Sequence, residues 1–127
     1  MSENGRIVLA VPTNGAGGLD GERSGHFGRC DCFTIVEIEN GTIVDTRVVD
    51  NPPHMDGGCL RPVNLLKGEG VNALVVGGIG GRPLAGFNDV GITVYFDTTI
   101  PQVGAVAEKV AAGEVGVIDP SFVCGGH

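Results

Sequence analysis

The chain has 127 residues, of which 42% are apolar and 18% are charged, and its formal net charge is −7. The length predicts one domain with its own core, and the composition excludes a disordered chain. The acidic balance, with only eight Lys and Arg residues, argues against nucleic-acid and anionic-membrane partners.

Hydrophobic periodicity predicts strands and helices in a mixed order along the chain. The predicted strands are residues 6–11, 33–39, 42–49, 73–76 and 92–96, and the predicted helices are residues 60–67, 82–87 and 101–112. Asn40-Gly41 lies between two alternating runs, which is a strong hairpin signal. The stretches 12–25 and 50–58 are predicted to be loops, and 114–127 an irregular tail.

This order predicts an α/β fold. A hairpin followed by βα units is typical of a mixed, mostly parallel sheet, here five-stranded and flanked by about three helices. The helix at 60–67 can supply the crossover that lets the first strand pair in parallel with the fourth. We expect one cofactor-binding domain over residues 1–113, followed by the tail 114–127.

All seven His and Cys residues lie outside the predicted strands and helices. They are His26, Cys30 and Cys32 in the first loop, His54 and Cys59 in the second, and Cys124 and His127 in the tail. No apolar run reaches the roughly 20 residues of a membrane span and no signal peptide is recognisable, so we expect a cytoplasmic protein. Cytosolic cysteines rarely form structural disulfides, which favours metal binding or catalysis.

The topology is expected to bring these loops together. The first loop enters one hairpin strand and the second loop leaves the other, so both should lie at one end of the sheet. If the first and fourth strands are parallel, the glycine run at 77–81 reaches the same end. That run predicts either a tight turn or a close approach of the backbone to an anionic group.

Cys30 and Cys32 are the first candidate metal ligands. Alternate residues of an extended segment face the same side, so both thiolates are expected to reach one metal site. Thiolates suit zinc, copper(I) and iron–sulfur centres, but this spacing is neither that of a zinc finger nor that of a ferredoxin. A glycine-rich turn with incidental thiols is the alternative.

Cys59, beside His54, is a second candidate with two interpretations. It stands at the start of a predicted helix, where a thiol pKa is lowered, so it can be a ligand or the nucleophile of a thiol-dependent enzyme. The alternative for this segment is a capping loop. Cys124 and His127 can fold over the site, although chain ends are often disordered. Arg29 can counter the charge of an anionic cofactor, or be solvated.

Two segments resemble a known family. Residues 24–29 (SGHFGR), followed by residues 71–80 (VNALVVGGIG), are similar to the dinitrogenase iron–molybdenum cofactor biosynthesis family, with a resemblance running from about Arg6 to Ala112. It indicates a small stand-alone member. It implies a ribonuclease-H-like fold and the binding of iron–sulfur or molybdenum-containing clusters without turnover.

The resemblance adds to the set of candidate residues. His26 matches the family's histidine, and His54 with Gly57 and Gly58 is similar to its second loop. The candidate cofactor-binding residues are therefore His26, Arg29, Gly57, Gly58, Gly78 and Gly80, and the candidate metal ligands are Cys30, Cys32, Cys59, His26, His54 and Cys124. The cysteines depart from the commoner family pattern, and four thiolates suffice for an iron–sulfur cluster.

The function expected from these features is the non-catalytic carriage or scaffolding of a metal–sulfur cluster. The cluster is expected to contain iron and sulfide, with molybdenum- or copper-containing clusters as other members of the class. Cluster donor and acceptor proteins are the expected partners, and the chain is expected to be a monomer or a homodimer. A zinc- or copper-binding module without sulfide and a thiol-dependent enzyme using Cys59 are the alternatives.

Overall fold

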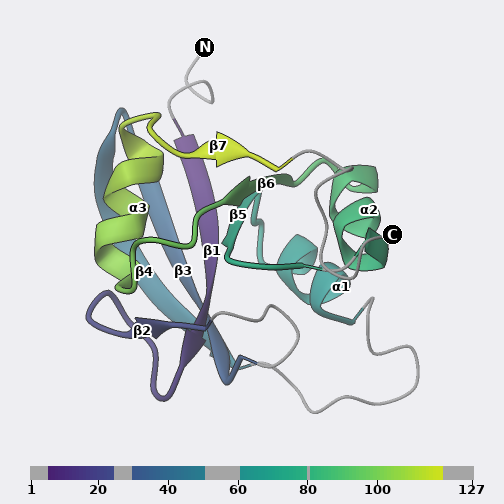
Figure 1. The fold of residues 1–127 in the computed structure, drawn as a ribbon, viewed down its shortest axis with the longest axis horizontal. Coiled ribbons are helices and arrows are strands. Elements are labelled where there is room, and N and C mark those ends of the chain that lie inside the picture. Colours follow the sequence, from purple (N-terminus) through teal and green to yellow (C-terminus); the bar gives the residue numbers. More distant parts are fainter. Residues whose placement is uncertain (1–5, 25–29, 51–60, 80, 119–127) are drawn as a thin grey trace.

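The computed structural model describes residues 6–24, 30–50, 61–79 and 81–118. Within them, seven strands form one mixed sheet and three helices pack on it (Figure 1). The strands are β1 (Arg6–Asn14), β2 (Glu22–Arg23), β3 (Cys32–Glu39), β4 (Thr42–Asp50), β5 (Ala73–Val76), β6 (Thr93–Phe96) and β7 (Gly116–Val117). The helices are α1 (Arg61–Gly68), α2 (Gly81–Asp89) and α3 (Val103–Ala111).

The sheet has an antiparallel half and a parallel half that meet at β1. The strand order is β4-β3-β1-β5-β6-β7, and β2 pairs with the end of β1. Strands β4, β3 and β1 pair antiparallel, whereas β1, β5 and β6 pair in parallel. The predicted parallel pairing of the first strand with the strand at 73–76 is therefore confirmed.

The predicted hairpin is also confirmed, and its turn has the expected geometry. Asn40 and Gly41 have φ angles of 54° and 81°, so both lie in the left-handed region that a two-residue hairpin turn requires. Asn and Gly are the residues that adopt this region at least cost. The turn places Glu39 opposite Thr42 at the start of the β3–β4 ladder.

The core lies on both faces of the sheet because the central strands alternate between them. Val8 and Ala10 of β1 belong to a buried cluster that includes residues of α1 and α2. Leu9 and Val11 belong to a second cluster, which includes the buried face of α3. Figure 1 shows α3 on one side and α1 with α2 on the other. The result is a single α/β domain with helices on both faces.

The prediction of five strands was wrong within this part of the chain. Strands β2 and β7 have two residues each, which is too short for any periodicity to reveal them. β2 lies in the stretch predicted to be a loop, and β7 in the stretch predicted to be an irregular tail. Their pairing partners, β1 and β6, are supplied by the tertiary structure.

Strand β1 is longer than predicted, because Pro12 does not end it. Proline has no N–H to donate, which placed the predicted end at Val11. In the structure the Pro12 carbonyl accepts a hydrogen bond from the Ser24 N–H at 2.9 Å, and pairing with β3 continues to Thr13. This extension carries β1 to the end of the sheet where the predicted loops begin.

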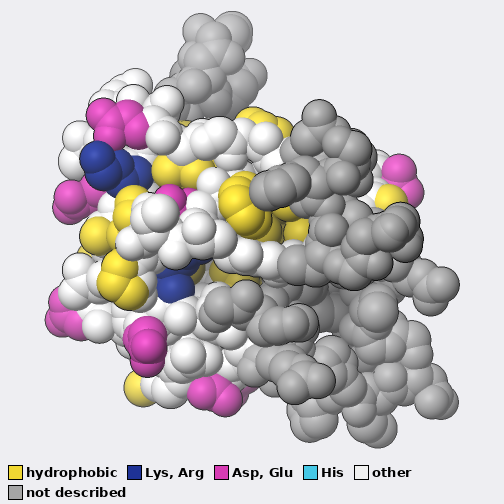
Figure 2. Space-filling view, in the orientation of Figure 1, with side chains coloured by type: hydrophobic (Ala, Val, Ile, Leu, Met, Phe, Trp, Pro, Cys, Tyr) yellow, Lys and Arg dark blue, Asp and Glu magenta, His cyan; other side chains and the backbone are white. Residues whose placement is uncertain are grey.

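None of the helices in the described ranges is long and apolar enough to cross a bilayer. Acidic side chains are spread over the described surface of the face in Figure 2 without a continuous basic stripe.

Candidate functional site

The segments predicted to converge do begin at one end of the sheet. Cys32, the first residue of β3, stands opposite both Thr13 of β1 and Asp50, the last residue of β4. The carboxyl ends of β5 and β6 follow the direction of β1 and reach the same end. In open α/β sheets, ligands bind outside the carboxyl ends of the parallel strands. This end is therefore the candidate site.

Most of the candidate residues proposed from the sequence cannot be placed there directly. The residues outside the described ranges are His26, Arg29, His54, Gly57, Gly58, Cys59, Gly80, Cys124 and His127. Their roles stay predictions. Cys30, Cys32 and Gly78 can be placed, and all three are buried.

Cys30 is part of the hydrophobic core. Its side chain is 5% exposed and belongs to the cluster that also contains Phe33, Ile35 and residues of α1 and α2. Burial raises the pKa of its thiol to about 12, against the opposing effect of a backbone hydrogen bond to Thr13. At neutral pH the sulfur is therefore a protonated thiol.

Cys32 is equally buried but lies in different surroundings. Its Sγ is 3.6 Å from the Gly15 carbonyl oxygen and 3.9 Å from that of Thr13, to which the thiol can donate. A Cβ built on Gly17 would stand 2.9 Å from this sulfur. Burial raises the pKa of Cys32 as well, followed by the negative charges of Asp31 and Asp50. Loop 15–17 therefore covers the sulfur.

The expectation that both thiols share one face is wrong for this structure. Cys32 continues the alternation of β3 that carries Thr34 and Val36, whereas Cys30 packs in the cluster of Phe33 and Ile35 on the other face. The reason is that residue 30 precedes the regular strand, which begins at Cys32. In the part of the chain that the structure describes, no three His, Cys, Asp or Glu side chains gather in a way that could hold a metal ion.

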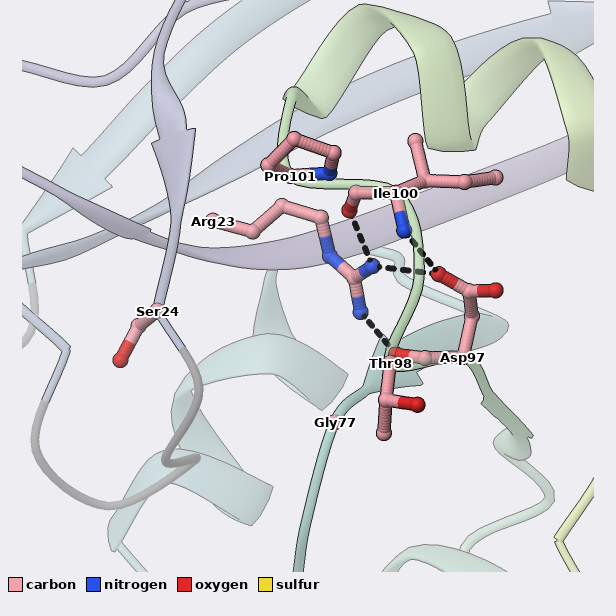
Figure 3. Close-up of a pocket in the computed structure, with 7 residues that line it drawn as sticks. All are labelled: Arg23, Ser24, Gly77, Asp97, Thr98, Ile100 and Pro101. Carbon is pink, nitrogen blue, oxygen red and sulfur yellow. Dashed lines mark hydrogen bonds and ion pairs between the residues drawn. The ribbon is translucent and has the colours of Figure 1, made fainter.

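A cavity of about 160 Å³ opens at the same end of the sheet (Figure 3). It is lined by Arg23, Ser24, Gly77, Asp97, Thr98, Ile100 and Pro101. Gly77 directly follows β5 and Asp97 directly follows β6, while Arg23 ends β2. Gly78, a predicted cofactor-binding residue, follows Gly77 and is buried there.

Arg23 and Asp97 organise this cavity. The Arg23 side chain is only 6% exposed, and its Nη1 donates to the Asp97 carboxylate at 2.9 Å and to the Ile100 carbonyl at 2.7 Å. Its Nη2 donates to the Asp97 carbonyl at 2.9 Å. The Asp97 carboxylate also accepts hydrogen bonds from the N–H groups of Thr99 and Ile100 and from the Thr99 hydroxyl. Burial raises the pKa of Asp97, but these hydrogen bonds outweigh it and lower the pKa overall.

Sequence reasoning did not single out this pair. Arg23 directly precedes the SGHFGR segment but was assigned to a loop. Asp97 follows the strand predicted at 92–96, and a polar residue at the carboxyl end of a parallel strand is a usable signal. The pairing itself spans 74 positions of sequence, so no local pattern reveals it.

The comparison with known proteins identifies the family. A family model described as dinitrogenase iron-molybdenum cofactor matches residues 5–113. The chain belongs to this family. The match covers β1 to α3 and therefore the whole sheet end that forms the candidate site. Membership relates the protein to nitrogenase cofactor biosynthesis and to association with a metal cluster.

Individual known proteins are similar to this chain in sequence or in structure. The chain is 41% identical over 80 residues to the uncharacterized protein MJ0580 of Methanocaldococcus jannaschii, covering 61% of this chain and 68% of that protein. The apo form of the orange protein from Desulfovibrio gigas superposes with a TM-score of 0.74 at 26% identity, over 87% of this chain and 92% of that one. The structure of PH0822 gives a TM-score of 0.74 at 27% identity, over 89% and 96% of the two chains.

Proposed function

We propose that the protein binds a metal–sulfur cluster as cargo at the carboxyl end of its parallel strands, and carries or scaffolds it without turnover. The family match over residues 5–113 is the observation that supports this proposal most directly. The similarity to the orange protein, whose solved form is described as apo, is consistent with it.

We further propose that the cargo is an iron–sulfur cluster, with molybdenum- or copper-containing metal–sulfur clusters as the other candidates. The fold is proposed to be ribonuclease-H-like. Cluster donor and acceptor proteins are the proposed partners of a cytoplasmic monomer or homodimer. Because β7 pairs with β6 and Ile118 belongs to the core, the proposed boundary between the binding domain and the tail moves from residue 113 to residue 118.

The described thiols do not by themselves make a cluster site. Cys30 and Cys32 are protonated and pack on two sides of the sheet, and a thiol must lose its proton to ligate a metal. Further donors must come from the segments that hold His26, His54 and Cys59. Ligation by Cys30 would also require its sulfur to leave the core cluster.

The first test is the composition of the protein purified without oxygen. We expect a visible absorbance band, with iron and acid-labile sulfide in the same sample. Stoichiometric zinc or copper without sulfide would replace the proposal with the metal-module alternative. A colourless, metal-free protein that does not take up a cluster on reconstitution would contradict both.

Cys30→Ala tests the thiol as a ligand, with Val63→Ala as its matched control. Both substitutions shorten a buried side chain in the same core cluster, but only the first removes a sulfur. We expect Cys30→Ala to lower the bound iron and sulfide per chain at least about ten-fold, a loss within the range known for metal ligands and their supports. Val63→Ala should retain them. Equal cluster content in the two variants would remove Cys30 from the ligand set.

A further inference from the structure

The cavity beside Arg23 contains a hydrogen-bond donor that its surroundings do not use. Nη1 and Nη2 of Arg23 are bonded to Asp97 and Ile100, but Nε is buried and finds no acceptor among the residues that the structure describes. Leaving a buried donor unpaired is costly, particularly on a charged group. An acceptor at this place would remove that cost.

Nε and Nη2 form one edge of the guanidinium, and the Arg23 side chain lines the cavity. Nε itself is buried, so an anion that accepts a hydrogen bond from it must displace the groups that now cover it. In Figure 3 the group points its Nη1 side at Asp97 and Ile100, while the opposite edge, formed by Nε and Nη2, is turned toward Gly77 and Ser24. Nη2 carries a second N–H besides the one it gives to the Asp97 carbonyl. Two parallel N–H groups on one edge match the two oxygens of an oxyanion.

The negative charge of Asp97 does not block this edge. Its carboxylate lies on the far side of the guanidinium and is stabilised by four donors: Arg23 Nη1, the N–H groups of Thr99 and Ile100, and the Thr99 hydroxyl. Its effect is to fix the orientation of Arg23. The guanidinium is thereby held in one position before any ligand arrives.

The size of the cavity limits what can enter. About 160 Å³ is below the roughly 300–1,000 Å³ of sites for drug-sized ligands, so only a group of a few heavy atoms fits. We propose that this cavity binds a small oxyanion through the Nε–Nη2 edge of Arg23. Carboxylate, phosphate and molybdate share the required chemistry. The proposal goes beyond cluster binding and does not depend on it.

The test uses the full chain, free of metal, labelled with ¹⁵N. Arginine Nε–H groups give their own signals, so the Arg23 signal can be followed while sodium phosphate, acetate or molybdate is added in separate titrations. We expect a saturable shift of the Arg23 Nε–H signal and slower exchange of this proton with water. The anion that saturates at the lowest concentration identifies the source. If none of the three moves this signal saturably, the proposal is wrong.

Three variants distinguish binding in the cavity from binding elsewhere. Arg23→Lys keeps the charge but loses the paired edge, and Thr98→Leu adds an apolar side chain at an exposed residue of the lining. Each should weaken binding at least about ten-fold, read from backbone amide shifts. Arg47→Lys is the control, because Arg47 forms its ion pairs with Glu37 and Glu69, which are not among the cavity residues. If Arg23→Lys fails to fold, Thr98→Leu still decides, and unchanged affinity in it would overturn the proposal.

Discussion

The two described cysteines differ from the expectation for ligands waiting in an open loop. Both are packed sulfur atoms, one in the core under α1 and α2 and the other beneath loop 15–17. A buried thiol is a small apolar side chain and reacts slowly. If the proposed cluster is bound through these sulfurs, its loading and a local rearrangement at the start of β3 are expected to occur together.

Because its thiol is buried, Cys30 is expected to be alkylated slowly. With its pKa raised from 9.0 to about 12, roughly one Cys30 in ten thousand is a thiolate at pH 8. We expect iodoacetamide to label Cys30 of the cluster-free native protein far more slowly than in urea, with a rate that rises about ten-fold per pH unit. Peptide mass spectrometry measures this. Labelling at the rate of the urea-unfolded chain would show that the thiol is exposed.

The same pKa links stability to alkaline pH. The unfolded chain loses the Cys30 proton near pH 9, whereas the folded chain retains it up to about pH 12. The stabilisation is complete below pH 9 and is lost as the pH rises from 9 to 12. Urea unfolding at several pH values should show a steeper alkaline loss in the wild type than in Cys30→Ala. Parallel profiles would contradict the burial of the thiol.

A second prediction at the residue scale concerns the ion pair between Arg23 and Asp97. Asp97→Ala would leave a buried guanidinium without its counter-charge, which should lower the free energy of unfolding by about 3 kcal/mol. Because hydrogen bonds lower the pKa of Asp97, its contribution is present above its ordinary value of 3.8 and is lost as the pH falls below that. Urea denaturation at pH 7 and pH 3 measures both effects.

An exposed ion pair provides the control for that measurement. Glu114 pairs with Lys109 at 2.9 Å, but both side chains are more than half exposed. Glu114→Ala should therefore leave the unfolding free energy nearly unchanged at both pH values. A loss as large as that of Asp97→Ala would show that charge removal, not burial, is responsible.

At the scale of elements, loop 15–17 follows β1 directly and covers the sulfur of Cys32. Gly17 has a φ of 83°, and a Cβ there would lie 2.9 Å from Cys32 Sγ and 3.0 Å from Val48. Gly15 has a similar φ of 72° but open space where its Cβ would be. The two glycines therefore separate backbone strain from packing.

Alanine at each position should measure the two effects. Gly15→Ala should cost about 1–2 kcal/mol from the left-handed backbone alone, whereas Gly17→Ala should cost at least about 1 kcal/mol more because Cys32 and Val48 must move. Thermal or urea unfolding of the pair supplies the comparison. Equal losses would mean that the loop does not press on the sulfur.

Some of these elements could be predicted from the sequence, and others could not. The Asn40-Gly41 hairpin and the parallel pairing of β1 with β5 follow from local turn chemistry and from strand–helix alternation. Strands β2 and β7 did not, since two residues carry no periodicity. At the site, the position of the strand ends from which the loops begin, at one end of the sheet, was predictable from strand direction. The burial of Cys30 and the pairing of Arg23 with Asp97 depend on contacts between distant segments, which a single sequence does not reveal.

For the whole molecule, β1 is the strand on which the two halves of the sheet depend. It pairs with β3 on one side and with β5 and β2 on the other, and residues 9–11 are fully buried. Its amides should exchange with solvent only through global unfolding. Strand β7, with two exposed residues at the sheet edge, should exchange by local opening.

Native-state hydrogen exchange followed by NMR tests this division. We expect the β1 amides to give opening free energies equal to the global unfolding value and the β7 amides to give distinctly smaller ones. Similar values for the two strands would mean that the edge unfolds only together with the centre.

Strand β1 also changes partner along its length, and this has a geometric consequence. It pairs with β5 at Leu9 and Ala10 and with β2 at Thr13 and Asn14, so its neighbour on this edge changes from β5 to β2 along the strand. The Arg23 side chain extends from β2 to the residues that follow β6, and its hydrogen bonds connect these two parts of the sheet. Shortening this one side chain would therefore break the connection between the two parts. A shorter residue at position 23 would also leave space where the guanidinium lies, and would widen the cavity even where every strand kept its place.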